Sequence, residues 1–262
     1  MLIGWKGALR RIGLAYAEVF RSTSSPLESE VFICGCGHSG TSLIANMFAA
    51  HPDVFVPPFE SDVFLEGDRV ARARLRTLRN AAIRSSKRFL VEKTPKHVRR
   101  LDTLRRVAPN GQIVLVVRDG RDVAASIAKR YRDSDATRGI QRWIADNTIV
   151  LAERESEDVF VYRHEDLVAN PEAIIRTICR FTAIPFHEAM LSYHRQQRLW
   201  FGEQEVRRGR PATNHLALRN WQVNQPIFDS RGVWKGVLSP AEVSLLIEGR
   251  GRVLMEAFGY LD

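Results

Sequence analysis

The sequence has little of what stabilises small secreted domains or builds metal sites. Only three cysteines occur among its 262 residues, Cys34, Cys36 and Cys179, which is too few for a disulfide framework and suits a reducing compartment. Cys34 and Cys36 fall on one face of a predicted strand end without a second pair of ligands, so zinc is not expected. We find no internal repeat, and no apolar run reaches the length of a membrane span.

The N-terminal segment also lacks the features of a secretory signal. Met1 to Phe20 mixes Trp5, Lys6 and Arg10 with apolar residues. Its apolar core is short, and no small-residue cleavage site follows it. We therefore predict a surface or capping helix within residues 1–30, with a peripheral membrane contact as the alternative.

Size and charge restrict the classes of protein that fit. A hydrophobic content of 45% in 262 residues is enough for one substantial α/β core, so we expect residues 1–262 to form a single domain. Lysine and arginine outnumber aspartate and glutamate by 39 to 30, giving a formal net charge of +9. This balance favours an anionic partner and leaves a charged nucleotide, a sulfated or carboxylated glycan and nucleic acid open.

The chain is organised around residues 31–44, which read VFICGCGHSGTSLI. A β-branched and aromatic run ends at a glycine-rich turn, and apolar residues then recur at helical spacing at Leu43, Ile44, Met47 and Phe48. The pattern predicts a strand, a tight loop and a helix. Because glycines let the loop N–H groups point inwards and the helix N-terminus adds partial positive charge, we expect the loop to bind a phosphate.

The spelling of this loop differs from that of a nucleoside-triphosphate loop. The frame from Gly35 to Ser42 keeps the glycines and the final hydroxyl, but Thr41 stands where the lysine of such a loop belongs. The residues that grip a terminal phosphate and its Mg²⁺ are therefore incomplete, and we expect no metal. A plain strand-turn-helix corner is the alternative.

Strands and helices alternate through the rest of the chain. We predict strands at 89–91, 112–117 and 159–162, and helices at 68–86, 98–107, 123–128, 139–154 and 172–181. Ser239 and Pro240 mark a further helix start. The result is an α/β fold with a P-loop-type parallel sheet flanked by helices, and ligands at the carboxyl ends of the strands. Residues 193–238, rich in Arg and Gln, are predicted to form a lid or acceptor-binding segment.

Four segments carry a family resemblance. They are His38 to Leu43 with Ala50-His51-Pro52-Asp53, Glu92-Lys93-Thr94-Pro95, Val117-Arg118-Asp119-Gly120-Arg121-Asp122-Val123 through Ser126, and Glu165 to Glu172. In this order they resemble sulfotransferases that use 3′-phosphoadenosine-5′-phosphosulfate (PAPS). The residues within the motifs are most similar to those of bacterial and Golgi-type carbohydrate sulfotransferases. The resemblance implies PAPS as co-substrate, adenosine 3′,5′-bisphosphate (PAP) as product and no metal.

The resemblance also implies two phosphate sites. The loop from Gly37 to Ser42 would wrap the 5′-phosphate, and Arg118 with Ser126 would hold the 3′-phosphate, which suits a guanidinium and a hydroxyl. The alternative for Arg118 is a salt bridge with Asp119 or Asp122. The predicted cofactor-binding residues are Gly37, His38, Ser39, Gly40, Thr41, Ser42, Arg118, Ser126 and Lys235, the last from a weaker match at 231–236, where Trp234 could pack near the adenosine.

Three residues are predicted to carry the chemistry. Glu60 is the candidate base for the acceptor hydroxyl, with Asp62, Glu66 and His38 as alternatives. Lys93 would stabilise charge on the sulfuryl and bridging oxygens, unless it is a solvated lysine. His38 stands where many relatives have Lys or Arg, so it is a candidate donor to the phosphosulfate but a weaker permanent cation.

The sequence thus predicts metal-independent sulfuryl transfer to a hydroxyl, on a carbohydrate or glycolipid, by a cytoplasmic bacterial enzyme. The alternatives are a phosphotransferase using ATP and Mg²⁺, and a basic nucleic-acid-binding protein that uses the arginines of 69–88. Against the latter, the basic residues are dispersed and no nucleic-acid-binding module appears. We expect no nucleic acid partner.

Overall fold

The computed structural model describes residues 27–131, 136–198 and 220–261. Its core is a sheet of five parallel strands in the order β2-β3-β1-β4-β5. Their bounds are β1 Ser29–Gly35, β2 Val54–Phe55, β3 Phe89–Lys93, β4 Gln112–Val117 and β5 Val159–Arg163. The predicted capping helix falls in residues 1–26 and the middle of the predicted lid in 199–219, both outside the described residues.

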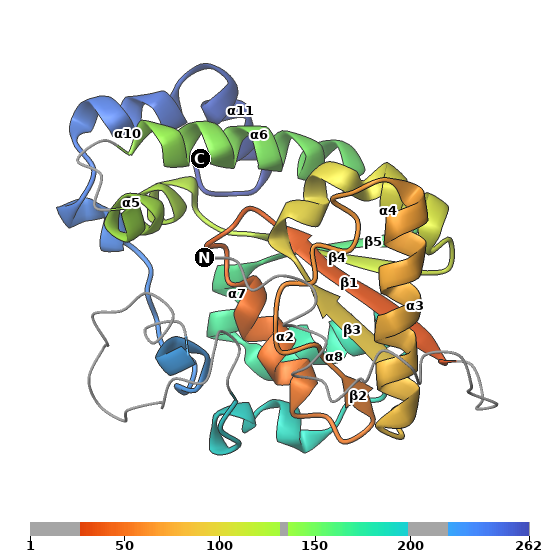
Figure 1. Ribbon diagram of the computed structural model, residues 1–262. Helices are drawn as coiled ribbons and strands as arrows, with labels where there is room; N and C mark the ends of the chain where they lie inside the picture. Colours follow the sequence, from red (N-terminus) through yellow and green to blue (C-terminus); the bar gives the residue numbers. More distant parts are fainter. Residues whose placement is uncertain (1–26, 132–135, 199–219, 262) are drawn as a thin grey trace.

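Helices connect the strands and cover both faces of the sheet (Figure 1). Their bounds are α2 Thr41–Ala49, α3 Asp68–Arg84, α4 Leu101–Val107, α5 Gly120–Tyr131, α6 Thr137–Glu153, α7 His164–Ala169, α8 Pro171–Thr182, α10 Pro240–Ile247 and α11 Gly249–Ala257. Short 3-10 helices lie at Pro95–Arg100, Glu188–Met190, Tyr193–Arg195 and Val233–Gly236. The predicted α/β class with a parallel sheet flanked by helices is confirmed.

Two helix predictions from local sequence patterns had different outcomes. Ser239 caps α10 and forms a capping box with Glu242, as its position before Pro240 indicated. The helix expected over 98–107 is divided, because Arg100 leaves helical geometry at φ −140°. A 3-10 helix that begins with Pro95 precedes the break, and α4 follows it.

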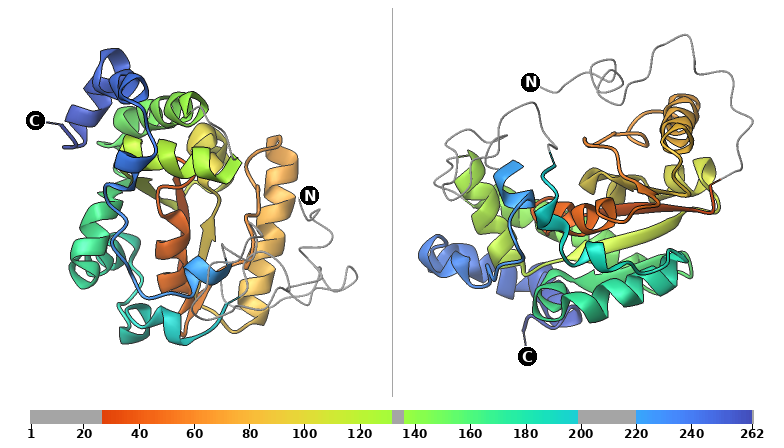
Figure 2. Two further views of the ribbon diagram at one scale, coloured as in Figure 1. Left: turned by 90° about the vertical axis from the view of Figure 1, so that its left-hand side faces the viewer. Right: turned by 90° about the horizontal axis from the view of Figure 1, so that it is seen from below.

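Alternating residues of β1 enter two separate cores. Phe32 and Cys34 face the cluster formed with α3, α4, α5 and α6, whereas Val31 and Ile33 face the cluster formed with α2 and α8. Figure 2 shows the two helical layers on opposite sides of the sheet. Because both faces are covered, central strands such as β4 are apolar throughout and buried.

The order of the strands determines where a ligand can bind. The chain runs from β1 outwards to β2 and β3, and then crosses to β4 and β5 on the other side of β1. The direction of winding therefore reverses next to β1, and in open parallel sheets the crevice at such a reversal binds ligands. Within the described residues, no helix is long and apolar enough to cross a bilayer.

Candidate active site

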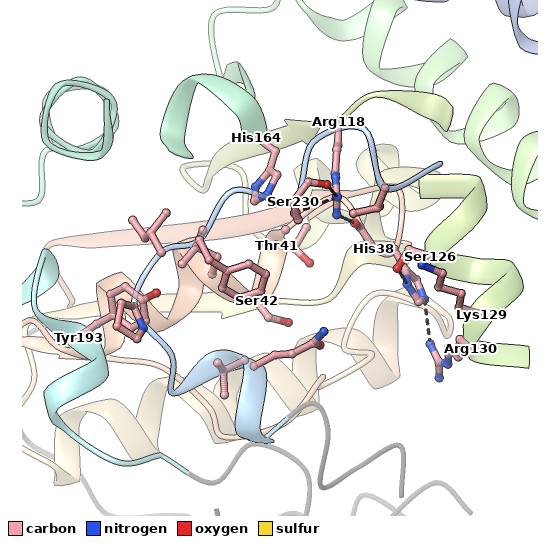
Figure 3. A pocket seen from close by; sticks show the side chains of 18 residues that line it. His38, Thr41, Ser42, Arg118, Ser126, Lys129, Arg130, His164, Tyr193 and Ser230 are labelled. Atoms are coloured by element: carbon pink, nitrogen blue, oxygen red, sulfur yellow. Dashed lines mark hydrogen bonds between the residues drawn. The ribbon is translucent and has the colours of Figure 1, made fainter. Parts of the chain in front are cut away.

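A cavity of about 400 Å³ opens at the carboxyl ends of β1, β4 and β5. The loop after β1 and the start of α2 form its floor, and α5 supplies one wall. The opposite wall comes from residues 222–233, which belong to the predicted lid segment. In Figure 3, Tyr193 lies at one end of the cavity and Arg130 at the other.

The floor depends on a glycine in a close approach. Gly40 precedes α2 with φ +94°, and a Cβ there would lie 2.3 Å from Nδ1 of His164. No other residue fits both the backbone angle and the space. α2 begins at Thr41 and has no acidic residue in its first turn, so its N-terminal partial charge is directed at the cavity floor without a carboxylate to neutralise it.

Arg118 joins the two walls of the cavity. Its guanidinium donates to the carbonyl oxygen of His38 at 3.2 Å and to both the carbonyl and the hydroxyl oxygen of Ser230 at 3.1 Å. The side chain therefore holds the phosphate loop and the far C-terminal segment together. Its position beside the loop agrees with a second anion site next to the first.

The salt-bridge alternative for Arg118 is not formed, because both nearby acids have other partners. Asp119 pairs with Arg121 at 2.7 Å. Asp122 accepts hydrogen bonds from the backbone N–H groups of Gly232 at 3.0 Å and Trp234 at 3.1 Å. Neither carboxylate lines the cavity, so the charge of Arg118 is available to an anion there.

His38 connects the loop to α5. Its Nδ1 lies 2.8 Å from Oγ of Ser126, and its Nε2 lies 3.3 Å from a guanidinium nitrogen of Arg130. A guanidinium can only donate, so Nε2 accepts and the proton sits on Nδ1, which donates to Ser126. The imidazole is uncharged in this pair of contacts, and the role of His38 as a donor to the phosphosulfate stays a prediction.

The permanent cations of the cavity come from other residues. The described residues that line it include Arg118, Lys129 and Arg130 and no acidic side chain. Lys129 and Arg130 were missed by the sequence analysis, which ended the predicted helix at 128. They lie three and four positions after Ser126 in α5 and so share its face. Three cationic side chains among the described lining residues favour a polyanion as the ligand.

His164 is a third residue that the sequence analysis missed. It follows β5, is buried and lines the cavity beneath Gly40. Burial, assisted by the positive charge of Arg118, lowers the pKa of His164 to about 3. The ring is therefore neutral near pH 7 and supports the loop rather than contributing charge.

The end of the cavity away from Arg130 is apolar. Tyr193 lies there in Figure 3, and Leu43, Val223 and Ile227, which also line the cavity, belong to the same apolar cluster. The Tyr193 hydroxyl donates to the carbonyl oxygen of Gln225 at 2.7 Å, which ties the two sides of this end together. The cavity thus combines a cationic end with an apolar end, which suits a ligand with a flat ring and separate phosphates.

A second group of predicted residues meets at the end of β3, the strand next to β1. Nζ of Lys93 lies 2.9 Å from Oε1 of Glu60, with the Lys93 side chain fully buried and that of Glu60 27% exposed. Lys93 is therefore not a solvated lysine. Glu66 instead pairs with Arg74 and is half exposed. Asp62 is partly buried, which raises its pKa. Of the three candidate carboxylates, Glu60 is the one that forms an ion pair with Lys93 in the described part of the chain.

The family model described as "Sulfotransferase family" matches residues 58–188 of this chain. The chain belongs to the sulfotransferase family. This confirms the family predicted from the sequence. The matched region contains Glu60, Lys93, Arg118 and Ser126, and the phosphate loop lies just before it.

Curated and solved sulfotransferases add relatives at low identity. Protein-tyrosine sulfotransferase 1 of Danio rerio is 29% identical over 202 residues, 62% of this chain and 55% of that protein. A putative protein-tyrosine sulfotransferase of Caenorhabditis briggsae is 26% identical over 201 residues, 65% of this chain and 71% of that protein. The chain thus spans about half the length of the zebrafish relative.

Two solved sulfotransferases share the fold over nearly the whole chain. The sulfotransferase domain from the curacin biosynthetic pathway has a TM-score of 0.66 at 19% identity, covering 90% of this chain and 99% of that one. Mouse SULT7A1, crystallised with PAP, has a TM-score of 0.53 at 15% identity, covering 88% of this chain and 90% of that one.

The remaining predicted site residues take other positions in this sulfotransferase. Gly37 does not line the cavity, and Arg142 occupies the space where its Cβ would be, 2.6 Å from the guanidinium. Lys235 is not among the lining residues, and the neighbouring Trp234 packs on the Arg121 guanidinium at 4.9 Å. Ser39 is fully buried beneath the loop. Their roles in binding the nucleotide stay predictions.

His51, Tyr162 and the three cysteines have structural surroundings away from the cavity. His51 contacts the carbonyl oxygen of Pro185 at 2.9 Å and accepts from the N–H of Asp53 at 3.0 Å. Tyr162 lies in the core, and the three cysteines are buried and unpaired with each other. Among the described residues, no cluster of three His, Cys, Asp or Glu side chains is arranged to hold a metal ion.

Proposed function

We propose that the protein transfers a sulfuryl group from PAPS to an acceptor hydroxyl and releases PAP. Membership of the sulfotransferase family supports the reaction class. The observation that carries the proposal is the pairing of two phosphate-binding features in one cavity. The loop before α2 is one, and the group of Arg118, Ser126 and Arg130 beyond it is the other.

The residues of the cavity fit such a donor. The cradle at Gly40, which a Cβ would fill, and the hydroxyls of Thr41 and Ser42 would hold the 5′-phosphate. Arg118 and Ser126 would hold the 3′-phosphate through charge-assisted and directed hydrogen bonds. The adenine would lie at the apolar end near Tyr193.

Transfer requires a base and a cation at the reacting end. The acceptor oxygen attacks sulfur, the bond from sulfur to the bridging oxygen of PAP breaks, and the acceptor proton passes to the Glu60 carboxylate. Lys93 supplies positive charge to the sulfuryl and bridging oxygens as the bond breaks. Because Lys93 is fully buried, its charge acts in a region of low effective dielectric, where it has more effect than at the surface.

The acceptor can come from either of two classes of hydroxyl. The residues of the sequence motifs predict a carbohydrate or glycolipid as the acceptor, whereas two relatives are named as protein-tyrosine sulfotransferases. We keep the carbohydrate as one proposed acceptor and add the tyrosine phenol as the other. In both cases the acceptor hydroxyl would lie next to the Glu60 carboxylate. The two classes differ in the protein surface that would bind the remainder of the acceptor molecule.

The first experiment is thermal unfolding with PAP, AMP, ADP and ATP, each with and without Mg²⁺. Binding to the native state at a hundred times Kd adds about 2.7 kcal/mol to the unfolding free energy. We expect stabilisation by PAP without Mg²⁺, and much less by AMP. Stabilisation only by ATP with Mg²⁺ would instead favour a phosphotransferase. Tyrosine-containing peptides and oligosaccharides are then compared as acceptors for sulfate from labelled PAPS.

A further inference from the structure

The last two residues of β3 contact two consecutive residues of the segment that carries the proposed base. Lys93 meets Glu60 at 2.9 Å, and the neighbouring Glu92 accepts from the Ser61 hydroxyl at 2.6 Å. Side chains alternate along a strand, so Glu92 and Lys93 leave β3 on opposite faces. The two contacts therefore fix this segment from both sides of the strand end.

Glu92 is an unusual residue to find in the core. Its side chain and that of His97 are fully buried, and an unsatisfied buried carboxylate costs several kcal/mol. Oε1 accepts from the hydroxyls of Ser61 at 2.6 Å and Thr94 at 2.7 Å and from the Ser61 N–H at 3.3 Å. Oε2 lies 3.1 Å from Nδ1 of His97.

The protonation state of His97 follows from its other neighbour. The N–H of Phe64 donates to Nε2 of His97 at 3.3 Å, so Nε2 carries a lone pair and the proton is on Nδ1, facing Glu92. The groups that hydrogen-bond to the carboxylate, the Ser61 N–H and the hydroxyls of Ser61 and Thr94, are all donors and all meet Oε1, whereas Oε2 lies near His97 Nδ1 without hydrogen-bond geometry. A glutamine here would keep one acceptor oxygen but would lose the negative charge that strengthens these three hydrogen bonds and would place an NH₂ group beside Nδ1 of His97.

The same donors hold the backbone of the segment. The Thr94 hydroxyl, which donates to Glu92, accepts from the N–H of Asp62 at 3.3 Å, and the Ser61 hydroxyl accepts from the N–H of Val63 at 3.3 Å. Asp62 itself has φ +52°, a conformation that needs support from its surroundings. Residues 61–64 thus depend on Glu92 at successive positions.

We propose that Glu92 is a positioning residue, which holds residues 61–64 on the end of β3 so that the Glu60 carboxylate meets Lys93. The proposal rests on the proposed function, because it assigns Glu92 to the geometry of that reaction. Glu92 touches neither substrate nor the reacting atoms. Its effect is on the position of Glu60, where an error of about 1 Å can cost about a hundredfold in rate.

Thr94 offers the cleanest test, because valine has the same shape without the hydroxyl. Thr94→Val removes the hydrogen bonds to Glu92 and Asp62, and Thr94→Ser restores them. Glu92→Gln removes the negative charge from the acceptor of the Ser61 and Thr94 hydroxyls. Thr182→Val is the matched control, since Thr182 is also fully buried and its hydroxyl bonds only backbone in α8 at 2.9 Å.

Four quantities are measured for each variant. They are the amide hydrogen exchange of residues 60–64, the affinity for PAP by calorimetry, and kcat and KM for PAPS with the best acceptor from the screen above. For Thr94→Val and Glu92→Gln we expect exchange to rise and kcat to fall by about ten- to a hundredfold, with PAP affinity and KM for PAPS within about twofold. Thr94→Ser should restore both quantities, and Thr182→Val should change neither.

The outcomes separate this inference from the proposed function. Unchanged exchange in Thr94→Val, or raised exchange with unchanged kcat, would overturn the role of Glu92. A parallel loss of kcat and PAP affinity would also overturn it, since the effect would then be a general loss of structure. If Glu92→Gln does not fold, the two Thr94 variants decide the question. A wild-type protein that does not bind PAP would overturn the proposed function itself.

Discussion

Replacing Gly40 by alanine should damage the phosphate loop in two separable ways. The backbone there has φ +94°, and the new Cβ would lie 2.3 Å from the His164 ring. Backbone strain at such an angle costs about 1–3 kcal/mol, and overpacking against a fixed neighbour costs about 1–3 kcal/mol. We therefore expect Gly40→Ala to lower the unfolding free energy by about 2–6 kcal/mol, a large share of the total of an ordinary domain.

A double-variant cycle separates the two contributions. His164→Ala removes the ring that the new Cβ strikes but leaves the backbone strain, so the double variant should be more stable than the sum of the single effects by about 1–3 kcal/mol. Urea unfolding measures each free energy. Gly236→Ala is the control, because its Cβ would meet nothing within 4 Å; we expect a change within about 0.5 kcal/mol. Strictly additive effects of Gly40→Ala and His164→Ala would refute the predicted clash.

Three further predictions concern the ligand, the reaction and pH. Arg118→Ala should weaken PAP binding by about a hundredfold, through the loss of charge-assisted hydrogen bonds, and AMP binding by less than about tenfold; equal losses in calorimetry would mean that Arg118 does not bind the 3′-phosphate. Lys93→Ala should lower kcat by about a hundred- to a thousandfold with little change in PAP affinity, and an unchanged kcat would remove Lys93 from the reaction. The pKa of His164 is lowered from 6.5 to about 3 in the folded chain, so the unfolded chain binds the proton first as the pH falls. The unfolding free energy should therefore decrease between pH 6.5 and 3, by up to about 1.4 kcal/mol per pH unit from this group. His164→Asn should remove that component, and parallel pH curves for wild type and variant in chemical denaturation would contradict it.

The fold was largely predictable because its signals are local. One short stretch of sequence contains the patterns of β1, its glycine loop and α2. The continuous apolar run of β4 identifies a strand that is covered on both faces. The division at Arg100 was not predictable, since it depends on how residues 95–100 pack beneath the sheet. Periodicity does not report such changes of helix type.

The site was predictable only where residues follow a strand end. Arg118 and Lys93 do so, and the parallel sheet brings their strand ends to one edge. Tyr193 and Phe228 line the cavity but belong to a segment without helical or strand periodicity in its apolar residues. No sequence pattern therefore predicts that they contribute to the site. Lys129 and Arg130 could have been found from their helical spacing to Ser126. The neutral state of His38 could not, because it depends on a contact with Arg130 across 92 positions of sequence.

The bond between Arg118 and Ser230 joins positions 112 residues apart, and this separation has a consequence for a chain that is still being made. At about 5–20 residues per second, a ribosome needs about 6–22 s to pass from one position to the other. During that interval the strands and the phosphate loop exist without the wall that completes the nucleotide cavity. A ligand that needs the complete cavity is therefore expected to protect the chain against unfolding and proteolysis only once residues 222–233 have added this wall.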